Sequence, residues 1–269
     1  MAAEDPAYRS TTQDELAELV AAGGRLTGLL FAPPLSLDDL DVSETAFERC
    51  LFRLPAIRSA NFSRCRFSDC RFEPTRFANC KLGAAQFEGC VLFDVAQKKG
   101  CTFAFCDLHA AELTKCNLAT SSFERCDLYD LRAVDCSFRG AQFRQSTFSK
   151  ALSRRTVITK GSFTNCNLSF ADLSGLSLEN CAFVSCRLSE ASFIDTDLSH
   201  ASMLSCALDR AEWDRAKLGH ADLQGSQLSG LNLALLADYA GLIVSASEQA
   251  ELLRQLGIDV RAEAGASRS

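Results

Sequence analysis

The sequence has few residues of the types that build active sites or membrane spans. Its 269 residues include three histidines, one tryptophan and two methionines. It has no apolar run of about 18 residues or more, so no membrane span is expected. The N-terminus MAAEDPAYRS has neither the basic nor the apolar region of a secretory signal, which indicates a cytoplasmic protein.

Nothing in the sequence predicts an enzyme, a cofactor or a metal site. There is no GxSxG, Walker loop or GxGxxG. His109 stands alone, and His200 and His220 are fewer ligands than a metal ion needs, although their spacing predicts that they stack on one outer face. We therefore expect no catalytic residues and no cofactor.

What the sequence does contain is a five-residue repeat. Large apolar residues occupy every fifth position from Phe47 to Leu92 and again, with Ala133 and Ser153 as exceptions, from Phe103 to Leu233. This period fits neither a helix nor an alternating strand. It requires a short inward-pointing segment followed by a corner, and four such units close a square coil. Residues twenty apart then stack as in parallel sheets, which predicts an all-β solenoid of about nine coils, roughly 45 Å long.

The stacking rule makes two further predictions about the core. One column of stacked aromatic rings is expected from Phe103, Phe123, Phe143, Phe163 and Phe183. All fourteen cysteines stand two residues before a repeat centre, in a slot that alanine fills elsewhere, and no CxxC occurs. Such cysteines pack as small apolar residues, so we expect reduced thiols rather than disulfides or metal ligands. One thiol ladder is expected from Cys106, Cys126, Cys166, Cys186 and Cys206.

Two segments depart from the repeat. The step from Leu92 to Phe103 is eleven residues, two units plus one residue, and contains the polar stretch FDVAQKKGC, so a projecting loop is predicted at 93–101. In 149–157, Ser153 replaces an apolar centre beside Lys150, Arg154 and Arg155. The repeat leaves open whether this second segment is a loop or an in-frame coil.

The coils are expected to span 42–234, with a helical cap at each end. The N-terminal extension, 1–41, has a predicted cap helix at about 12–22 with a capping box from Thr12 and Glu15, and a linker at Pro33–Pro34. The C-terminal module, 235–260, is expected to form a helix that starts after Ser247 and stops at Gly257. Residues 261–269 are expected to be a disordered tail.

The charge is distributed unevenly along the predicted rod. Residues 46–160 hold 19 Lys and Arg against 11 Asp and Glu, and residues 161–260 hold 5 against 13. The basic half includes Arg64, Arg66, Arg71, Arg76 and Lys81, but we expect no aromatic side chains between them on the outer face to stack on bases. The acidic half can attract a cationic partner; its expected surface carboxylates are Asp195, Asp197, Asp209, Glu212, Asp214 and Asp222.

The repeat unit, as in ADLSG (171–175) and CRFSD (65–69), resembles the pentapeptide-repeat family. The resemblance implies a right-handed quadrilateral parallel β-helix. The interruption at 93–101 is similar to the first projecting loop of the Qnr quinolone-resistance proteins. SFRGAQF (137–143) and NLSFADLS (167–174) resemble the segments that flank their second loop, and LLRQLGIDV (252–260) resembles their C-terminal dimer segment. The first 45 residues have no Qnr counterpart.

The resemblance implies a non-enzymatic DNA mimic that binds DNA gyrase or topoisomerase IV and protects it from inhibitors such as quinolones. No direct nucleic-acid or membrane binding is expected. The implied partner-binding loop is Phe93, Asp94, Val95, Ala96, Gln97, Lys98 and Lys99, and the implied homodimer interface is Leu252, Leu253, Leu256 and Ile258. The alternative is a scaffold or adaptor for protein–protein interaction, for instance one associated with a bacterial secretion system.

Overall fold

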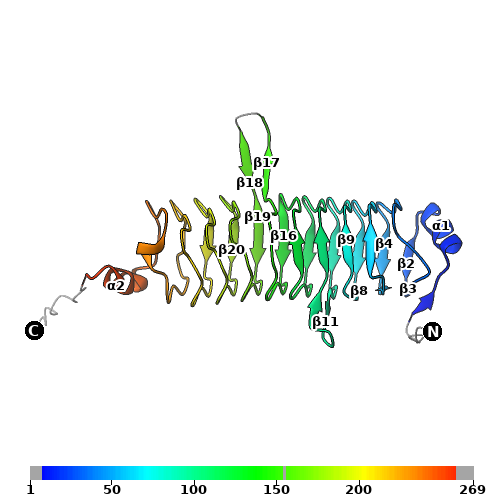
Figure 1. Ribbon diagram of the computed structural model, residues 1–269, viewed down its shortest axis with the longest axis horizontal. Helices are drawn as coiled ribbons and strands as arrows, with labels where there is room; N and C mark the ends of the chain where they lie inside the picture. The colour runs from blue at the N-terminus through cyan, green and yellow to red at the C-terminus, as the bar shows by residue number, and fades with distance from the viewer. Residues whose placement is uncertain (1–7, 154–155, 259–269) are drawn as a thin grey trace, which may run out of the picture.

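The computed structural model describes residues 8–153 and 156–258, and it confirms the predicted class, a four-sided parallel β-solenoid. The chain forms a straight rod with helix α1 near one end and helix α2 near the other (Figure 1). About ten coils stack along it, because residues one coil apart pair in parallel register on all four sides. We name these sides faces A to D in the order in which the chain visits them.

Each face is a ladder of very short strands or single bridges. Face A is one sheet of nine strands: β2 Arg25–Thr27, β4 Ala46–Glu48, β7 Arg66–Ser68, β10 Gln86–Glu88, β14 Glu112–Thr114, β16 Leu131–Val134, β19 Gly161–Thr164, β20 Ala182–Val184 and β21 Ser202–Leu204. Face B begins with β1 Arg9–Ser10, β3 Leu29–Phe31, β5 Leu51–Phe52 and β8 Arg71–Phe72. Face C begins with β6 Ala56–Arg58, β9 Arg76–Ala78, β13 Thr102–Ala104 and β15 Ser122–Glu124. Beyond these strands, faces B and C continue as isolated bridges, and face D consists of them throughout.

The repeat centres point inward and are buried, and a corner follows each of them. The corner residue two positions after a centre has a positive φ, as at Arg49 (48°) and Asp69 (52°). This left-handed conformation turns the chain through the corner in two or three residues. It explains why the unit is five residues long: an inward-pointing segment and a tight turn need no more.

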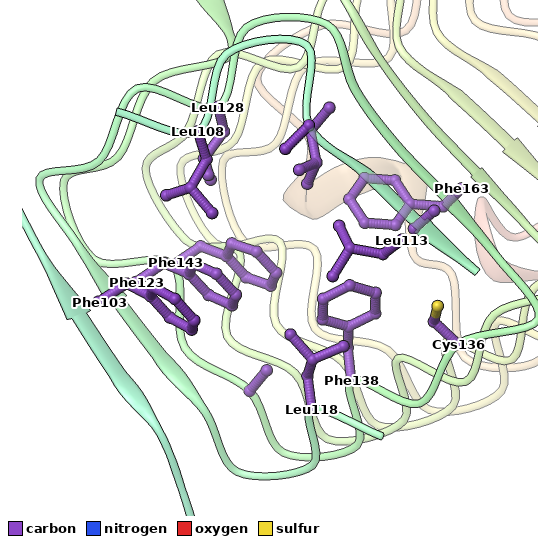
Figure 2. Close-up of a cluster of buried hydrophobic side chains, with 14 of the residues drawn as sticks. Phe103, Leu108, Leu113, Leu118, Phe123, Leu128, Cys136, Phe138, Phe143 and Phe163 are labelled. Carbon is purple, nitrogen blue, oxygen red and sulfur yellow. The ribbon is translucent and has the colours of Figure 1, made fainter. Parts of the chain in front are cut away.

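The predicted aromatic column is wrong beyond Phe143. Phe77, Phe103, Phe123 and Phe143 stack on face C with ring centroids 4.8, 5.1 and 4.9 Å apart. The next residue of that column is Leu173, because Gln142 pairs with Asp172. Phe163 instead lies on face A, above Ala133 and 5.2 Å from Phe183. Figure 2 shows Phe103, Phe123 and Phe143 aligned, with Phe163 on another side of the core.

The cause is an insertion of two whole units. The coil that joins Ala133 to Phe163 has 30 residues, ten more than a regular coil, and the extra ten project as a hairpin. Beyond this hairpin, a residue that the five-residue period assigns to one face therefore lies two faces away from it. The same shift divides the predicted thiol ladder: Cys106 and Cys126 stand before face D, whereas Cys166, Cys186 and Cys206 stand before face B.

The face B ladder is longer than the prediction, with eight cysteines in consecutive coils: Cys50, Cys70, Cys90, Cys116, Cys136, Cys166, Cys186 and Cys206. All fourteen cysteines are free and buried. Most of their thiols lie against backbone carbonyls of the previous coil, as Cys90 Sγ does at 3.3 Å from Phe67 O. Burial raises the pKa of the Cys101 thiol to about 12, so it is a poor nucleophile at neutral pH.

The coils begin earlier and end later than the predicted limits of 42 and 234. Leu26, Phe31 and Leu37 are already buried core residues, so Pro33–Pro34 lies within the first coil rather than in a linker before it. At the other end, the bridges Lys217↔Asp238 and Asp222↔Ile243 extend the stack past a short 3₁₀ helix, η1 Leu233–Leu235.

Both ends carry a helix. Helix α1, Gln13–Ala21, has the predicted capping box, in which Thr12 and Glu15 each accept a hydrogen bond from the other's backbone N–H. Helix α2, Ala246–Gln255, starts after Ser245, so the predicted cap at Ser247 is wrong. The Ser245 hydroxyl instead accepts a hydrogen bond from the Gly225 N–H of the preceding coil, at 2.7 Å.

Candidate partner-binding surfaces

The first projecting segment is a small antiparallel hairpin between faces B and C. Strands β11, Phe93–Asp94, and β12, Lys99–Gly100, pair with each other. The Asp94 carboxylate accepts a hydrogen bond from the Gln97 N–H at 2.9 Å, which shapes the turn, and Val95 at the tip is 75% exposed. The coil from Phe77 to Phe103 has 26 residues, six more than a regular coil. The eleven residues from Leu92 to Phe103 are therefore one regular unit of five plus an insertion of six.

Gly100 fixes the hairpin to the coil above it. Its N–H donates to Thr120 Oγ1 at 2.9 Å. A Cβ at this position would lie 2.5 Å from Ala119 O and 2.6 Å from Ser121 N, both backbone atoms that cannot move aside easily. Glycine is therefore required where the hairpin rejoins the stack.

The second segment is a longer hairpin, which leaves the rod between faces D and A. Strands β17, Ser149–Ala151, and β18, Val157–Thr159, pair antiparallel, and the Ser149 and Thr159 hydroxyls are 2.8 Å apart at its base. Lys150 Nζ lies 5.5 Å from the centre of the Tyr129 ring. Arg154 and Arg155 lie outside the described residues.

The two hairpins emerge from opposite corners of the square. The first follows Leu92 on face B and the second follows Phe148 on face D, and in Figure 1 they extend on opposite sides of the rod. A partner that contacts both must therefore reach around the rod.

The six predicted surface carboxylates do not share one face. Asp222 lies on face A, Asp209 on face B, Glu212 and Asp214 on face C, and Asp197 on face D. Negative charge therefore surrounds this half of the rod.

Two of the six carboxylates are compensated. Asp195 accepts from Arg215 Nε at 2.6 Å, and Asp197 lies 2.9 Å from Lys217 Nζ. The Arg215 hydrogen bond holds the pKa of Asp195 below its ordinary value. Within the described part of the chain, the other four carboxylates have no ion pair.

Part of the basic half is also neutralised, by acidic side chains one coil closer to the N-terminus. Asp38 pairs with Arg58 at 3.1 Å, and Glu44 pairs with Arg64. Arg76 is 3.5 Å from Glu124, and Arg66 donates to Gln86. The first coil therefore reduces the positive charge of the coil that follows it.

The C-terminal end exposes apolar surface. Leu252 is 5% exposed and packs on the chain's own core, whereas Leu256 is 41% and Ile258 50% exposed. Leu253 is partly buried and, with Leu252, borders a cavity of about 260 Å³ between α2 and the last coil. Leu235, Tyr239 and Ile243 add further exposed apolar area on the same terminal module.

Two exposed aromatic side chains were missed by the sequence analysis. Phe105 and Phe170 are 51% and 46% exposed, and Phe105 lies in the basic half, whose outer face was expected to have no aromatic side chains between its arginines. Arg125 lies over the first ring and Arg139 over the second. Their positions two residues after a repeat centre, where the chain turns outward, were the available signal.

The described residues hold no group of three or more His, Cys, Asp or Glu side chains placed to bind a metal ion. His200 and His220 stack on the outer surface as predicted, 5.0 Å apart. None of the helices that the structure describes is long and apolar enough to cross a membrane.

Comparison with known proteins places these features in a family. Sequence profiles described as "Pentapeptide repeats (8 copies)" match residues 57–92, 100–140 and 136–175, and one described as "Pentapeptide repeat region" matches 156–233. Together they cover more than half of the chain. The quinolone resistance pentapeptide repeat protein QnrB96 of Scandinavium goeteborgense is 25% identical over 131 residues, which span 47% of this chain and 61% of that protein.

Solved structures share the fold. Full-length QnrB1, a plasmid-mediated fluoroquinolone resistance protein, superposes with a TM-score of 0.66 at 23% identity, over 88% of this chain and all of QnrB1. HetL, a pentapeptide repeat protein involved in heterocyst differentiation regulation in the cyanobacterium Nostoc, superposes with a TM-score of 0.54 at 19% identity, over 87% of this chain and 94% of HetL. The chain belongs to the pentapeptide-repeat family and is Qnr-like within it.

Proposed function

We propose that the protein is a non-enzymatic DNA mimic that binds a type II topoisomerase, DNA gyrase or topoisomerase IV, and protects it from inhibitors such as quinolones. The observation that carries this proposal is a rod with two hairpins at opposite corners and, beyond them, uncompensated carboxylates on three of its four faces. The Qnr relatives, named for quinolone resistance, support the choice of partner.

The carboxylates and the hairpins would contribute to binding in different ways. A cationic DNA-binding groove attracts DNA phosphates over a long range. Carboxylates placed around a narrow rod are attracted to such a groove in the same way. That attraction is not specific. Specific recognition comes from the first hairpin, 93–99, and from the second, which begins at Ser149, because exposed loops on a rigid scaffold can be shaped without disturbing the core.

The C-terminal module would pair two copies through Leu253, Leu256 and Ile258. Exposed apolar side chains at a rod end favour a symmetric interface, in which the same patch serves both subunits. Such a dimer would be twice as long, with its acidic halves at the centre and its basic halves at the tips.

The proposal is tested by the salt dependence of binding to immobilised gyrase. Wild-type protein should bind, and its affinity should fall as salt is added. Converting the four uncompensated carboxylates to amides should weaken binding at low salt and flatten the salt dependence. The matched control makes the same change in net charge within the basic half, through Asp69→Asn, Glu88→Gln, Asp127→Asn and Asp135→Asn. Equal effects of the two variants, or no binding by wild-type protein, would reject the proposal.

A second candidate is a scaffold or adaptor that holds other proteins together. The structural likeness to HetL favours it, because a regulatory protein uses the same rod. It predicts that proteins other than topoisomerases are captured by the chain and that gyrase is not.

A further inference from the structure

Phe105 occupies a position that the fold itself does not favour for a phenyl ring. Its φ is 56°, in the left-handed region, where bulky residues are rare and glycine, asparagine or aspartate fit better. Among the described corner residues with positive φ, only Phe105 and Phe170 carry a phenyl ring. Half of the Phe105 side chain is exposed, so core packing does not account for it either.

The ring is held as part of an organised surface. The Arg125 guanidinium lies 5.5 Å from the centre of the Phe105 ring, in the following coil. Arg125 Nε donates to Gln145 Oε1 at 2.7 Å, one coil further, which fixes the guanidinium above the ring. Three successive coils therefore build one aromatic and cationic edge between faces C and D.

This edge borders a groove of about 510 Å³ on face C. Its lining is Phe105, Glu124, Arg125, Arg144, Gln145 and Ser174. Within the described part of the chain, the exposed Arg144 guanidinium has neither an ion-pair nor a hydrogen-bond partner. The single carboxylate of the lining, Glu124, already faces Arg76 at 3.5 Å. The groove thus presents an available positive charge next to a half-exposed ring.

We propose that this groove binds an acidic, extended segment of a partner protein, with a carboxylate paired to Arg144 and an apolar side chain packed on Phe105. Arginine pairs with carboxylates in a planar, two-point geometry, and arginines and aromatic residues dominate binding energy at interfaces. A nucleic acid fits less well, because its continuous phosphates would meet the Glu124 carboxylate and find only one unpaired guanidinium, that of Arg144, in the lining. This inference does not depend on the topoisomerase proposal.

The test is selection of peptides on the full-length protein. A random dodecapeptide library displayed on phage is panned on wild-type protein and, in parallel, on a Phe105→Gly, Arg144→Gln double variant. We expect wild-type protein alone to enrich peptides that combine Asp or Glu with apolar residues. The leading peptide is then made with a fluorescent label, and its affinity is measured by anisotropy.

Single variants separate the site from general effects. Phe105→Gly and Arg144→Gln should each weaken the peptide roughly thirtyfold, the loss typical of a central interface residue. Phe170→Gly is the matched control: it removes a ring outside the groove that has the same backbone conformation and an arginine of its own, Arg139, over its face, and it should leave affinity unchanged. Thermal melts should show all variants folded, since glycine suits both corners; Phe105→Asn serves as a second substitution if Phe105→Gly melts early.

Three results would overturn the proposal. One is equal enrichment on wild-type protein and the double variant. Another is a leading peptide whose affinity is unchanged by Phe105→Gly, Phe105→Asn and Arg144→Gln. The third is a labelled deca-thymidylate that binds with the same dependence on Phe105 and displaces the peptide, which would assign the groove to single-stranded nucleic acid.

Discussion

Removing Asp94 to Lys99 should leave a folded rod, because the deletion restores the five-residue period. Leu92 and Phe103 would then be separated by Phe93, Gly100, Cys101 and Thr102. Gly100 would fall at the corner position where other coils have a positive φ, as Gly89 and Gly140 do. Cys101 would keep its small-residue slot, and Phe103 its place above Phe77.

The magnitude follows from what the hairpin contributes. The deletion removes the pairing of β11 with β12, both Phe93↔Gly100 and Asp94↔Lys99, whose hydrogen bonds are each worth about 1 kcal/mol net. It also shortens a loop, which recovers conformational entropy of the order of 0.6 kcal/mol per halving of loop length. These effects oppose each other, so the free energy of unfolding should change by no more than about 1 kcal/mol. For a chain of this size, that corresponds to roughly 2–4 °C in Tm.

The assay is thermal unfolding followed by circular dichroism and calorimetry. The control is a deletion of the same length within the uninterrupted repeat, 114–119, which removes one unit and one further residue. Because six residues are not a whole number of units, this control deletion would turn inward-pointing residues of the next coil outward, and it should abolish the folded state. Two results would refute the view that the hairpin is a six-residue insertion into a regular coil. One is a loss of about 3 kcal/mol or more in the free energy of unfolding of the hairpin deletion, and the other is an equal loss of stability in both deletions.

Three further predictions concern the core and the ends. Phe143→Ala should cost about 3–5 kcal/mol, because the ring is buried and stacked on its neighbour at 4.9 Å, whereas Phe93→Ala at the base of the hairpin should cost far less by urea unfolding. Stability should fall above pH 9, since burial raises the pKa of Cys101 and Cys181 from 9.0 to about 12. Between these values the unfolded thiols ionise and the folded ones do not, so each lowers the free energy of unfolding by about 1.4 kcal/mol per pH unit, and Cys101→Ala should reduce the slope of Tm against pH. Leu253→Asp with Leu256→Asp should give monomers in light scattering, and a variant that remains dimeric would remove that interface.

The repeat predicted the fold because every unit obeys the same steric requirement. Large residues at every fifth position point inward, and most of the slots two residues before them hold a small residue, such as Cys90, Ala111 or Thr196. What the period could not reveal was an insertion of two units. Ser153 and Ile158 continue the count through the second hairpin, so the columns beyond Phe143 were assigned to the wrong faces. The first hairpin, with six extra residues, broke the count and was visible.

Surface features were less predictable, because corners and outward positions accept many residue types. The total charge of each half was evident, but not that Arg215 and Lys217 would stack one coil above Asp195 and Asp197 and compensate them. The position of Phe105, two residues after a repeat centre, predicts an outward side chain but no role for its ring. Its meaning depends on Arg144, 39 positions later in the sequence, which only the coil geometry brings alongside.

The most direct test of the proposed function is gyrase supercoiling of relaxed plasmid in the presence of ciprofloxacin. Wild-type protein should restore supercoiling, and the folded hairpin deletion lacking Asp94 to Lys99 should lose most of that protection while keeping its Tm. Protection that survives the deletion would contradict the role of the hairpin. Wild-type protein that neither binds gyrase nor alters its inhibition would contradict the topoisomerase assignment itself.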